Sequence, residues 1–253
     1  MIEEARERTL AWDGCLNVRD LGGLPTEDGG TTRHGLIIRS DNVGHLSPAG
    51  WRALSGHGVE RIVDLRWPEE VADDPPLDVE VEVVHVSVLG PSLLDGHDFL
   101  RELDAHVDEV EDIADHYAWS YVEFLERHQA AFGRALAAVA EADGTVVIHC
   151  MGGKDRTGLV AALLLRLAGV SIEQIGLDYA LTAANLAPRT ATWLDQAPTE
   201  RDRRRIEKLS GTPASAMNRV IAAIEERHGG VDGYLAEAGL EAEQIQRLRE
   251  RLR

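Results

Sequence analysis

The segment 144–170 constrains the fold of this chain more than any other. It begins with a short β-branched run, Thr145–Ile148, of the kind that forms a buried strand. It ends with Leu159–Leu167, an apolar run too long for an ordinary strand and rich in leucine and alanine, which favour helix. A polar loop with two glycines lies between the two runs. The segment therefore predicts a strand, a loop that begins at Cys150, and a helix that begins near Arg156.

This loop has the chemistry of an anion site. The amides of residues 151–156 can turn inward, and the first turn of the helix adds N–H groups at the positive end of its dipole. Arg156 supplies a planar fork that can pair with two phosphate oxygens, which lysine cannot reproduce. Gly152 and Gly153 let the backbone approach a ligand closely. The same positive field favours the thiolate form of Cys150, so a nucleophile would face a bound phosphoryl group.

Two motifs carry a resemblance to a known family. His149-Cys150, five residues and then Arg156-Thr157-Gly158 resemble the phosphate-binding signature of the cysteine-dependent protein tyrosine phosphatase superfamily. Residues 17–23, Asn-Val-Arg-Asp-Leu-Gly-Gly, resemble the opening motif of its bacterial tyrosine/lipid dual-specificity branch, whose loop reads Lys-Asp-Arg-Thr-Gly. The similarity runs from about residue 12 to the carboxyl terminus, with weaker matches at Arg39-Ser40-Asp41, Asp64-Leu65-Arg66 with Glu69, and Val231–Leu235.

The resemblance implies a phosphomonoester hydrolase that needs neither metal nor cofactor and forms a phosphocysteine intermediate. Cys150 would attack phosphorus while Arg156 and the loop amides hold the oxygens. Lys154 is expected to add charge to the pocket, and His149 to orient the loop as a buried histidine. The hydroxyl of Thr157 could donate toward Cys150 or simply cap the helix. The expected phosphate contacts come from Met151, Gly152, Gly153, Lys154, Asp155, Arg156 and Thr157.

The proton donor for the leaving group stays open among three carboxylates. Asp155 comes first because the family resemblance suggests it. Asp64 comes second because it ends a predicted parallel strand, and ligands bind beyond the carboxyl ends of such strands. Glu69 comes third. It follows Trp67-Pro68, which is similar to the Trp-Pro-Asp acid loop of many relatives, but it also fits the Asp-Leu-Arg-x-x-Glu pattern of the bacterial branch, so we interpret the Trp-Pro pair as a coincidence.

The order of strands and helices predicts an α/β fold with a small, mostly parallel central sheet and helices on both faces. Besides the loop strand, we expect strands at Leu36–Arg39, Val59–Leu65 and Val79–Val88. Ser47-Pro48 should begin a helix, as should Ser171, Thr212-Pro213 and Glu241. No internal repeat or linker divides the chain, so residues 1–253 form one predicted phosphatase domain.

Two regions leave a choice between structure and function. In residues 92–133 apolar side chains recur at helical spacing, which predicts one or two amphipathic helices that cover the sheet. The family resemblance suggests instead a helical lid over the active site. Arg201-Asp202-Arg203-Arg204-Arg205 is the one basic cluster, and it is either a solvated helix face or a docking patch for phosphoinositide head groups.

The composition of the chain limits the classes of partner that it can bind. A net charge of −18 argues against a general nucleic-acid binder and against a broad grip on anionic membranes. The ten histidines show no metal-ligand spacing. The amino terminus has no apolar signal region, and no stretch approaches about 18 uninterrupted apolar residues, so we expect a cytoplasmic protein without stable membrane insertion. Export by a route that needs no signal peptide stays open. The expected partners are a phosphorylated protein or a phosphoinositide, with inorganic phosphate as the product ligand.

Two alternatives concern the cysteines and the activity. Two cysteines are too few for a disulfide scaffold, so Cys15 is either a packed residue or a redox partner that caps Cys150 as a disulfide. The second candidate function is a phosphate-binding scaffold without turnover. The presence of Cys150, Asp155 and Arg156 together argues against that scaffold.

Overall fold

A single five-stranded sheet organises the computed structural model, which describes residues 8–74, 80–92 and 97–253. The strand order is β1-β2-β5-β3-β4. Only β1 is antiparallel to its neighbour, and the other pairs are parallel. The predicted α/β class with a mostly parallel sheet is confirmed. The strands are β1 (Arg19–Asp20), β2 (Ile37–Ser40), β3 (Val59–Asp64), β4 (Glu82–His85) and β5 (Thr145–His149).

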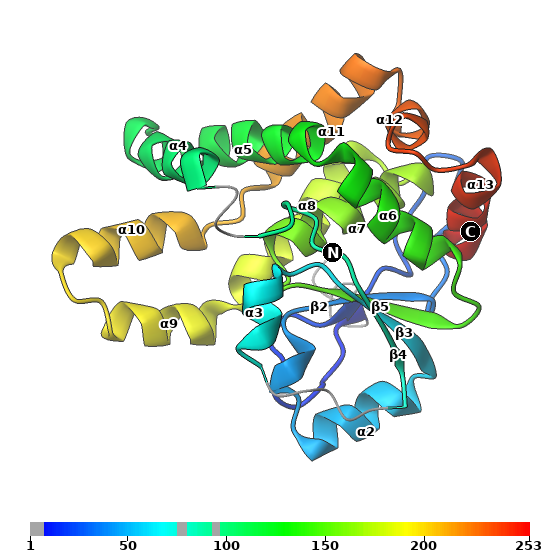
Figure 1. The fold of residues 1–253 in the computed structure, drawn as a ribbon, viewed down its shortest axis with the longest axis horizontal. Coiled ribbons are helices and arrows are strands. Elements are labelled where there is room, and N and C mark those ends of the chain that lie inside the picture. The colour runs from blue at the N-terminus through cyan, green and yellow to red at the C-terminus, as the bar shows by residue number, and fades with distance from the viewer. Residues whose placement is uncertain (1–7, 75–79, 93–96) are drawn as a thin grey trace.

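Helices cover the two faces of the sheet unequally (Figure 1). One face carries the short η1 (Val43–His45) and α2 (Pro48–Gly56), which pack with Trp12 on a small core that includes Val147 of β5. The larger core lies on the other face, where β5 contributes Val146 and Ile148. The alternation along β5 therefore feeds both cores, as expected for a central strand buried on both sides.

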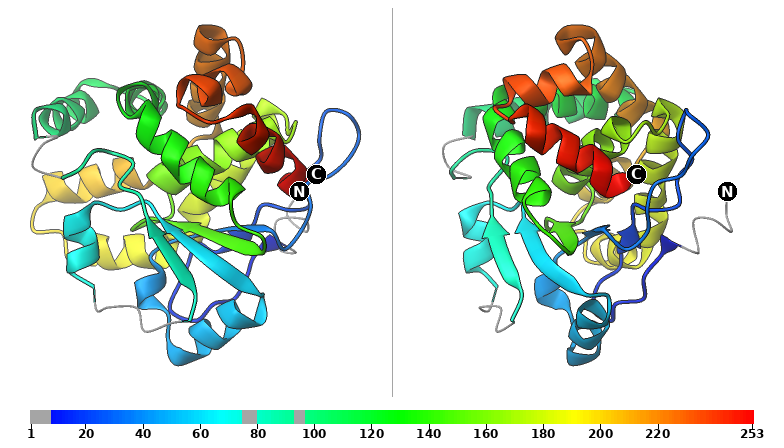
Figure 2. Two further views of the ribbon diagram at one scale, coloured as in Figure 1. Left: turned by 45° about the vertical axis from the view of Figure 1, so that its right-hand side comes forward. Right: turned by 90° about the vertical axis from the view of Figure 1, so that its right-hand side faces the viewer.

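The larger core is built around α7 (Asp155–Leu167), whose residues are buried nearly all round. A helix that is apolar on every side must lie inside a bundle, and Figure 2 shows α7 enclosed by the helices above the sheet. These helices are α5 (Ile113–Arg127), α6 (Gln129–Ala140), α8 (Ile172–Asn185), α11 (Ala214–His228), α12 (Val231–Glu237) and α13 (Ala242–Leu252).

The register of the sheet fixes the place of the site. His149, the last residue of β5, lies opposite Ser40 of β2 and Asp64 of β3. Because these strands are parallel, their carboxyl ends meet at one rim, and the loop after β5 emerges there. The rim is flanked by α3 (Pro68–Ala72), α4 (His97–Glu109), α9 (Ala187–Asp195) and α10 (Glu200–Ser210) (Figure 1).

The region 92–133 contains three helices, α4, α5 and the start of α6, where the sequence predicted one or two. Residues 93–96 of that prediction lie outside the described residues. The basic cluster lies on α10 and faces α4: Arg205 pairs with Asp104 and Asp108, and Arg201 pairs with Asp108 at 3.0 Å. These two arginines therefore bind α4, which weakens the interpretation of the cluster as a head-group patch.

Most predicted element starts agree with the structure. Ser47 caps α2 with Pro48 in first position, and the Ser171 hydroxyl accepts the Gln174 N–H at the start of α8. The strand predicted at Val79–Val88 is shorter, because β4 covers only Glu82–His85, and residue 79 lies outside the described residues. β4 is an edge strand and largely exposed, so its alternation buries little. Among the described residues, no helix combines the length and apolar character needed to span a bilayer.

Candidate active site

The loop from β5 to α7 begins at Cys150, which is 2% exposed. Lys154 occupies the N-cap position of α7 without a side-chain cap, so the N–H groups of the first turn are available to a ligand. Gly153 has φ +62°, and a Cβ there would lie 2.5 Å from the carbonyl oxygen of Ser40. Glycine is required at this position because the loop turns in a left-handed conformation against β2.

Side chains behind the loop hold its carbonyl groups outward. The Asn17 amide donates to the carbonyl oxygens of Gly152 and Gly153, at 3.1 and 3.0 Å. The Arg39 guanidinium donates to Gly153 at 2.7 Å. The carbonyl of Met151 accepts the backbone N–H of Asn42 at 3.2 Å. With the carbonyl oxygens engaged on the outer side, the amides can line the inner side as an anion cradle.

These supports rest on a buried aspartate that the sequence did not suggest. Asp178 of α8 accepts hydrogen bonds from Arg8 at 2.9 Å, Arg19 at 3.1 Å and Arg39 at 2.9 Å. Burial alone would raise the pKa of Asp178, but the three guanidinium groups hold it well below its usual range. Burial and the charge of Arg19 lower the pKa of Arg39 to about 10. Arg19 of the motif at residues 17–23 and Arg39 of the weaker match Arg39-Ser40-Asp41 thus share one counterion.

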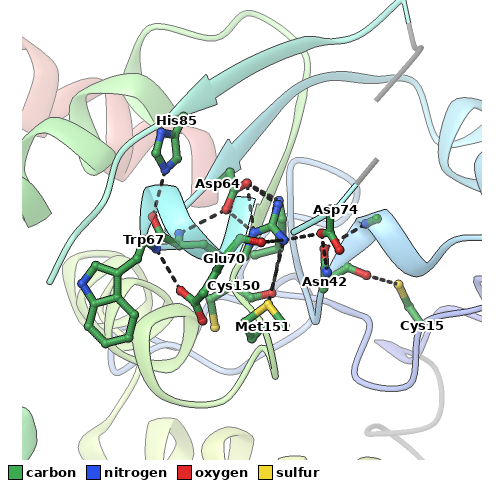
Figure 3. Close-up of polar contacts among 12 residues, drawn as sticks. Cys15, Asn42, Asp64, Trp67, Glu70, Asp74, His85, Cys150 and Met151 are labelled. Carbon is green, nitrogen blue, oxygen red and sulfur yellow. Dashed lines mark hydrogen bonds and ion pairs between the residues drawn. The ribbon is translucent and has the colours of Figure 1, made fainter. Parts of the chain in front are cut away.

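Arg156 is held from the front by Glu70, the third residue of α3. The two side chains form a bidentate ion pair, with Nη2 and Oε1 2.8 Å apart, and the guanidinium lies 4.9 Å from the ring centre of Trp67. Burial opposes the charge of Arg156, but the hydrogen bond to Glu70 raises its pKa. Figure 3 shows Glu70 beside Trp67 and Cys150. The sequence pattern pointed to Glu69, which instead accepts a hydrogen bond from Ser92 at 2.5 Å.

Asp155, the first residue of α7, faces the same pocket. Its side chain is 43% exposed, and its Oδ1 accepts a hydrogen bond from the Tyr121 hydroxyl. The Tyr121 hydroxyl also lies 2.8 Å from that of Tyr179. Tyr121 comes from α5, so this helix fixes the direction of the first candidate acid.

A pocket of about 190 Å³ lies in front of Asp155 and Arg156. Its walls come from α4, from α5 and from the segments before α3 and after β4, and they are mainly aromatic and apolar. Among the described residues that line it, Arg156 is the one side chain that is permanently cationic. The lining residues are Trp67, Leu89, Leu103, His116, Tyr117, Ser120, Tyr121, Phe124, Asp155 and Arg156.

Asp64 lies at the predicted rim but is turned away from this pocket. It is 2% exposed, and its Oδ2 lies 2.7 Å from Nη2 of Arg66. Burial would raise the pKa of Asp64, but hydrogen bonds and charge from Arg66 hold it below its ordinary value. A carboxylate stabilised in the charged form and closed to solvent is poorly suited to donate a proton, so the geometry argues against the Asp64 alternative (Figure 3).

Lys154 lies beside the pocket but does not line it, and its predicted contribution of charge stays a prediction. Its ammonium donates to the Leu209 carbonyl at 2.7 Å and to the Tyr117 hydroxyl at 2.5 Å, and it lies 4.2 Å from the Tyr117 ring centre. Burial lowers the pKa of this side chain. The ammonium points toward α5 and α10, where it meets the Tyr117 ring and the Leu209 carbonyl near the end of α10, which also accepts the Tyr117 hydroxyl at 2.6 Å.

The remaining predicted residues lie around the loop. His149 is fully buried with Nδ1 3.4 Å from the Cys150 carbonyl, and burial lowers its pKa, which favours a neutral structural histidine. The Thr157 hydroxyl is buried without a hydrogen-bond partner in the described part of the chain.

Cys15 and Cys150 are both free thiols. Cys15 donates to the Asn42 carbonyl at 3.4 Å, and burial raises its pKa to about 12, which favours the packed interpretation over a reactive thiol (Figure 3). Among the described residues, no His, Cys, Asp and Glu side chains cluster as metal ligands.

The site combines a cysteine at the end of a central strand, a loop whose carbonyl groups are held outward, and an arginine at the start of a helix. This combination defines the site of a cysteine-dependent phosphatase. The chain belongs to the tyrosine phosphatase family, whose model matches residues 10–253. The predicted family and enzyme class are therefore confirmed.

Three relatives cover most of the chain. A tyrosine-protein phosphatase of Nostoc commune is 29% identical over 234 residues, covering 85% of this chain and 74% of the relative. A putative tyrosine-protein phosphatase of Cupriavidus necator is 30% identical, covering 90% and 83%. The triple specificity protein phosphatase PtpB of Mycobacterium tuberculosis is 29% identical, covering 93% and 96%.

Proposed function

We propose that the protein hydrolyses phosphotyrosine through a phosphocysteine intermediate. The observation that carries this proposal is the loop of residues 150–156, whose carbonyl groups are held outward behind the Cys150 thiol. The Cys150 thiolate forms a bond to phosphorus as the ester P–O bond breaks, and Asp155 gives its proton to the leaving oxygen. Water then attacks phosphorus, Asp155 takes up a proton, and the P–S bond breaks to release inorganic phosphate and the thiolate.

Arg156 can serve this reaction while Glu70 remains in place. A guanidinium has five N–H donors, and the pair with Glu70 uses two of them. The other three are available to phosphate oxygens. Glu70 and the Trp67 ring fix the plane of the guanidinium, which limits the reorganisation needed when the dianion binds.

The aromatic pocket supports an aryl phosphomonoester as the substrate. Tyr117, Tyr121 and Phe124 can pack against a phosphotyrosine ring. A phosphoinositide head group with several phosphates would need further cations, and Lys154 is engaged elsewhere. The name of the mycobacterial relative, triple specificity protein phosphatase, supports testing phosphoserine and phosphothreonine as further substrates.

The lid predicted in residues 92–133 corresponds best to α4. Leu103 of α4 lines the pocket, and α4 is joined to α10 by the ion pairs of Arg201 and Arg205. Such exposed pairs stabilise a contact by only about 0–1 kcal/mol each. Opening of α4 would also have to break the packing of Phe99 on Phe124 and the hydrogen bonds of the Lys208 ammonium to the carbonyls of Val107 and Val110. The lid and the cytoplasmic location both stay predictions.

The test is hydrolysis of p-nitrophenyl phosphate with chelator and reductant present, comparing the native protein with Cys150→Ser. We expect turnover without metal in the native protein and a loss of about 10⁵-fold in the variant, which should still bind phosphate. Activity retained in Cys150→Ser would eliminate the mechanism. A folded native protein without turnover would favour the scaffold alternative.

A further inference from the structure

We propose that a second cavity beside the active site binds an acidic side chain that flanks the phosphotyrosine of a protein substrate. This inference rests on the proposed function. The cavity measures about 560 Å³ and lies beyond the carboxyl end of β4, between α3 and the start of α6. It is lined by Pro68, His85, Val86, Ser87, Gly90, Pro91, Arg127, His128, Ala130, Ala131 and Arg134.

One wall separates this cavity from the active-site pocket. Trp67 and Leu89 line the pocket, while the next residues along the chain, Pro68 and Gly90, line the cavity. The Trp67 indole N–H donates to the Leu89 carbonyl at 3.2 Å and joins the two segments into that wall. A substrate in the pocket can therefore reach the cavity by crossing a barrier one residue thick.

The sheet gives the span that the substrate must cover. β4 lies two strands from β5 and ends at the same rim. Neighbouring strands are about 4.8 Å apart, so the two strand ends are separated by roughly 10 Å. An extended peptide advances about 3.4 Å per residue, which places the flanking residue about three positions from the phosphotyrosine.

The charge of the cavity contrasts with that of the chain. Its ionisable lining residues are Arg127, Arg134, His85 and His128, all basic, in a chain with a net charge of −18. No carboxylate side chain contributes to this lining within the part of the chain that the structure describes. Burial and the charge of Arg127 lower the pKa of His128, so the positive charge of the cavity comes from its two arginines, which favour an anionic group.

Arg134 is the cation best placed to hold that group. Arg127 is already paired with Glu123 at 2.8 Å, whereas Arg134 contacts only the Ala130 carbonyl, at 3.3 Å, and has no carboxylate partner among the described residues. The first turn of α6 lies in the same lining, and His128 at its N-cap makes no side-chain cap. The backbone N–H groups of Ala131 and Phe132 in this turn donate to the His128 carbonyl at 2.8 and 3.1 Å, so the attraction for a carboxylate comes from the Arg134 guanidinium.

The test compares three phosphotyrosine peptides of equal length, with acidic residues on the amino-terminal side, on the carboxyl-terminal side, or on neither. Values of kcat/KM are measured for the native protein, for Arg134→Glu and for Arg247→Glu, a matched charge reversal on the distant α13. We expect the native protein to prefer one acidic peptide by about tenfold, the effect of one charge-assisted hydrogen bond. Arg134→Glu should abolish this preference and Arg247→Glu should keep it. All three proteins should hydrolyse p-nitrophenyl phosphate at similar rates.

A native protein that hydrolyses p-nitrophenyl phosphate but is indifferent to the flanks would overturn the inference and leave the proposed function intact. A preference that survives in Arg134→Glu would also overturn it. Absence of p-nitrophenyl phosphate hydrolysis would contradict the proposed function itself. The preference should weaken as ionic strength rises, because charges at this exposed cavity are screened, and a preference independent of salt would count against the electrostatic origin.

Discussion

The two sides of the phosphate loop are held in different ways. Behind the loop, Asn17 and Arg39 are almost fully buried, and Arg39 rests on the equally buried Asp178. In front, the side chains of Asp155 and Arg156 contact α5 and α3 at the pocket, where substrate has access. The backbone cradle is thus fixed before substrate arrives, while the side chains that meet the substrate have partners that can be exchanged.

Removal of Asp178, the shared counterion behind the loop, should destabilise all the contacts behind the loop together. Asp178→Ala leaves three buried guanidinium groups around an empty position, so we expect the free energy of unfolding to fall by about 3–5 kcal/mol. Urea unfolding measures this change, with exposed Asp195→Ala on α9 as the control. An unchanged unfolding midpoint would contradict the idea that Asp178 anchors the rear.

Substitutions in front of the loop should reduce the catalytic rate with little loss of stability. Asp155→Asn removes the proposed proton donor, so kcat should fall about 10²-fold for phenyl phosphate, a poor leaving group, and far less for p-nitrophenyl phosphate. Asp64→Asn is the comparison, because it disturbs the buried pair with Arg66. We expect it to reduce stability, and any loss of kcat to be equal for both substrates. If Asp64→Asn alone shows the dependence on leaving group, the two roles should be exchanged.

Two adjacent glutamates, Glu70 and Glu69, offer a matched test of the ion pair that holds Arg156. Glu70→Ala frees the guanidinium of Arg156, and we expect kcat/KM for p-nitrophenyl phosphate to fall about tenfold through the loss of a charge-assisted hydrogen-bonded pair. Glu69→Ala should have little effect, because its carboxylate contacts Ser92. Steady-state kinetics decide between them, and equal losses in both variants would mean that α3 as a whole, and not Glu70, positions Arg156.

The smallest expected effect concerns pH. Burial and the nearby His106 lower the pKa of His116 from its usual 6.5 to about 4. Between these values the unfolded chain binds a proton that the folded chain does not, so the free energy of unfolding falls as the pH falls through this window. His116→Gln should remove about 1–2 kcal/mol of the difference between pH 7 and pH 5. Unfolding at both pH values measures it, with exposed His45→Gln as the control. An equal pH dependence in the native protein and His116→Gln would refute this.

Local patterns predicted the fold and the loop, but not the partners of the loop. Cys150 and Arg156 lie within one strand–loop–helix segment, where spacing along the chain determines position. Asp178 is 139 residues from Arg39, and Glu70 is 86 residues from Arg156. Such pairings depend on how helices pack, which periodicity does not specify. The direction of the Lys154 side chain has the same cause, since its ammonium contacts Tyr117 and Leu209, which come from distant helices.

The shared counterion also bears on how this family can change. Replacing any one of Arg8, Arg19, Arg39 or Asp178 singly leaves charge unbalanced in the interior, and such couplings are not additive. Evolutionary routes that alter one of these positions should therefore require compensation at another. We expect relatives without an aspartate at the position of Asp178 to lack at least one of the three arginines as well. The arginines near the amino terminus would then depend on Asp178 of α8, which lies more than a hundred positions away along the chain.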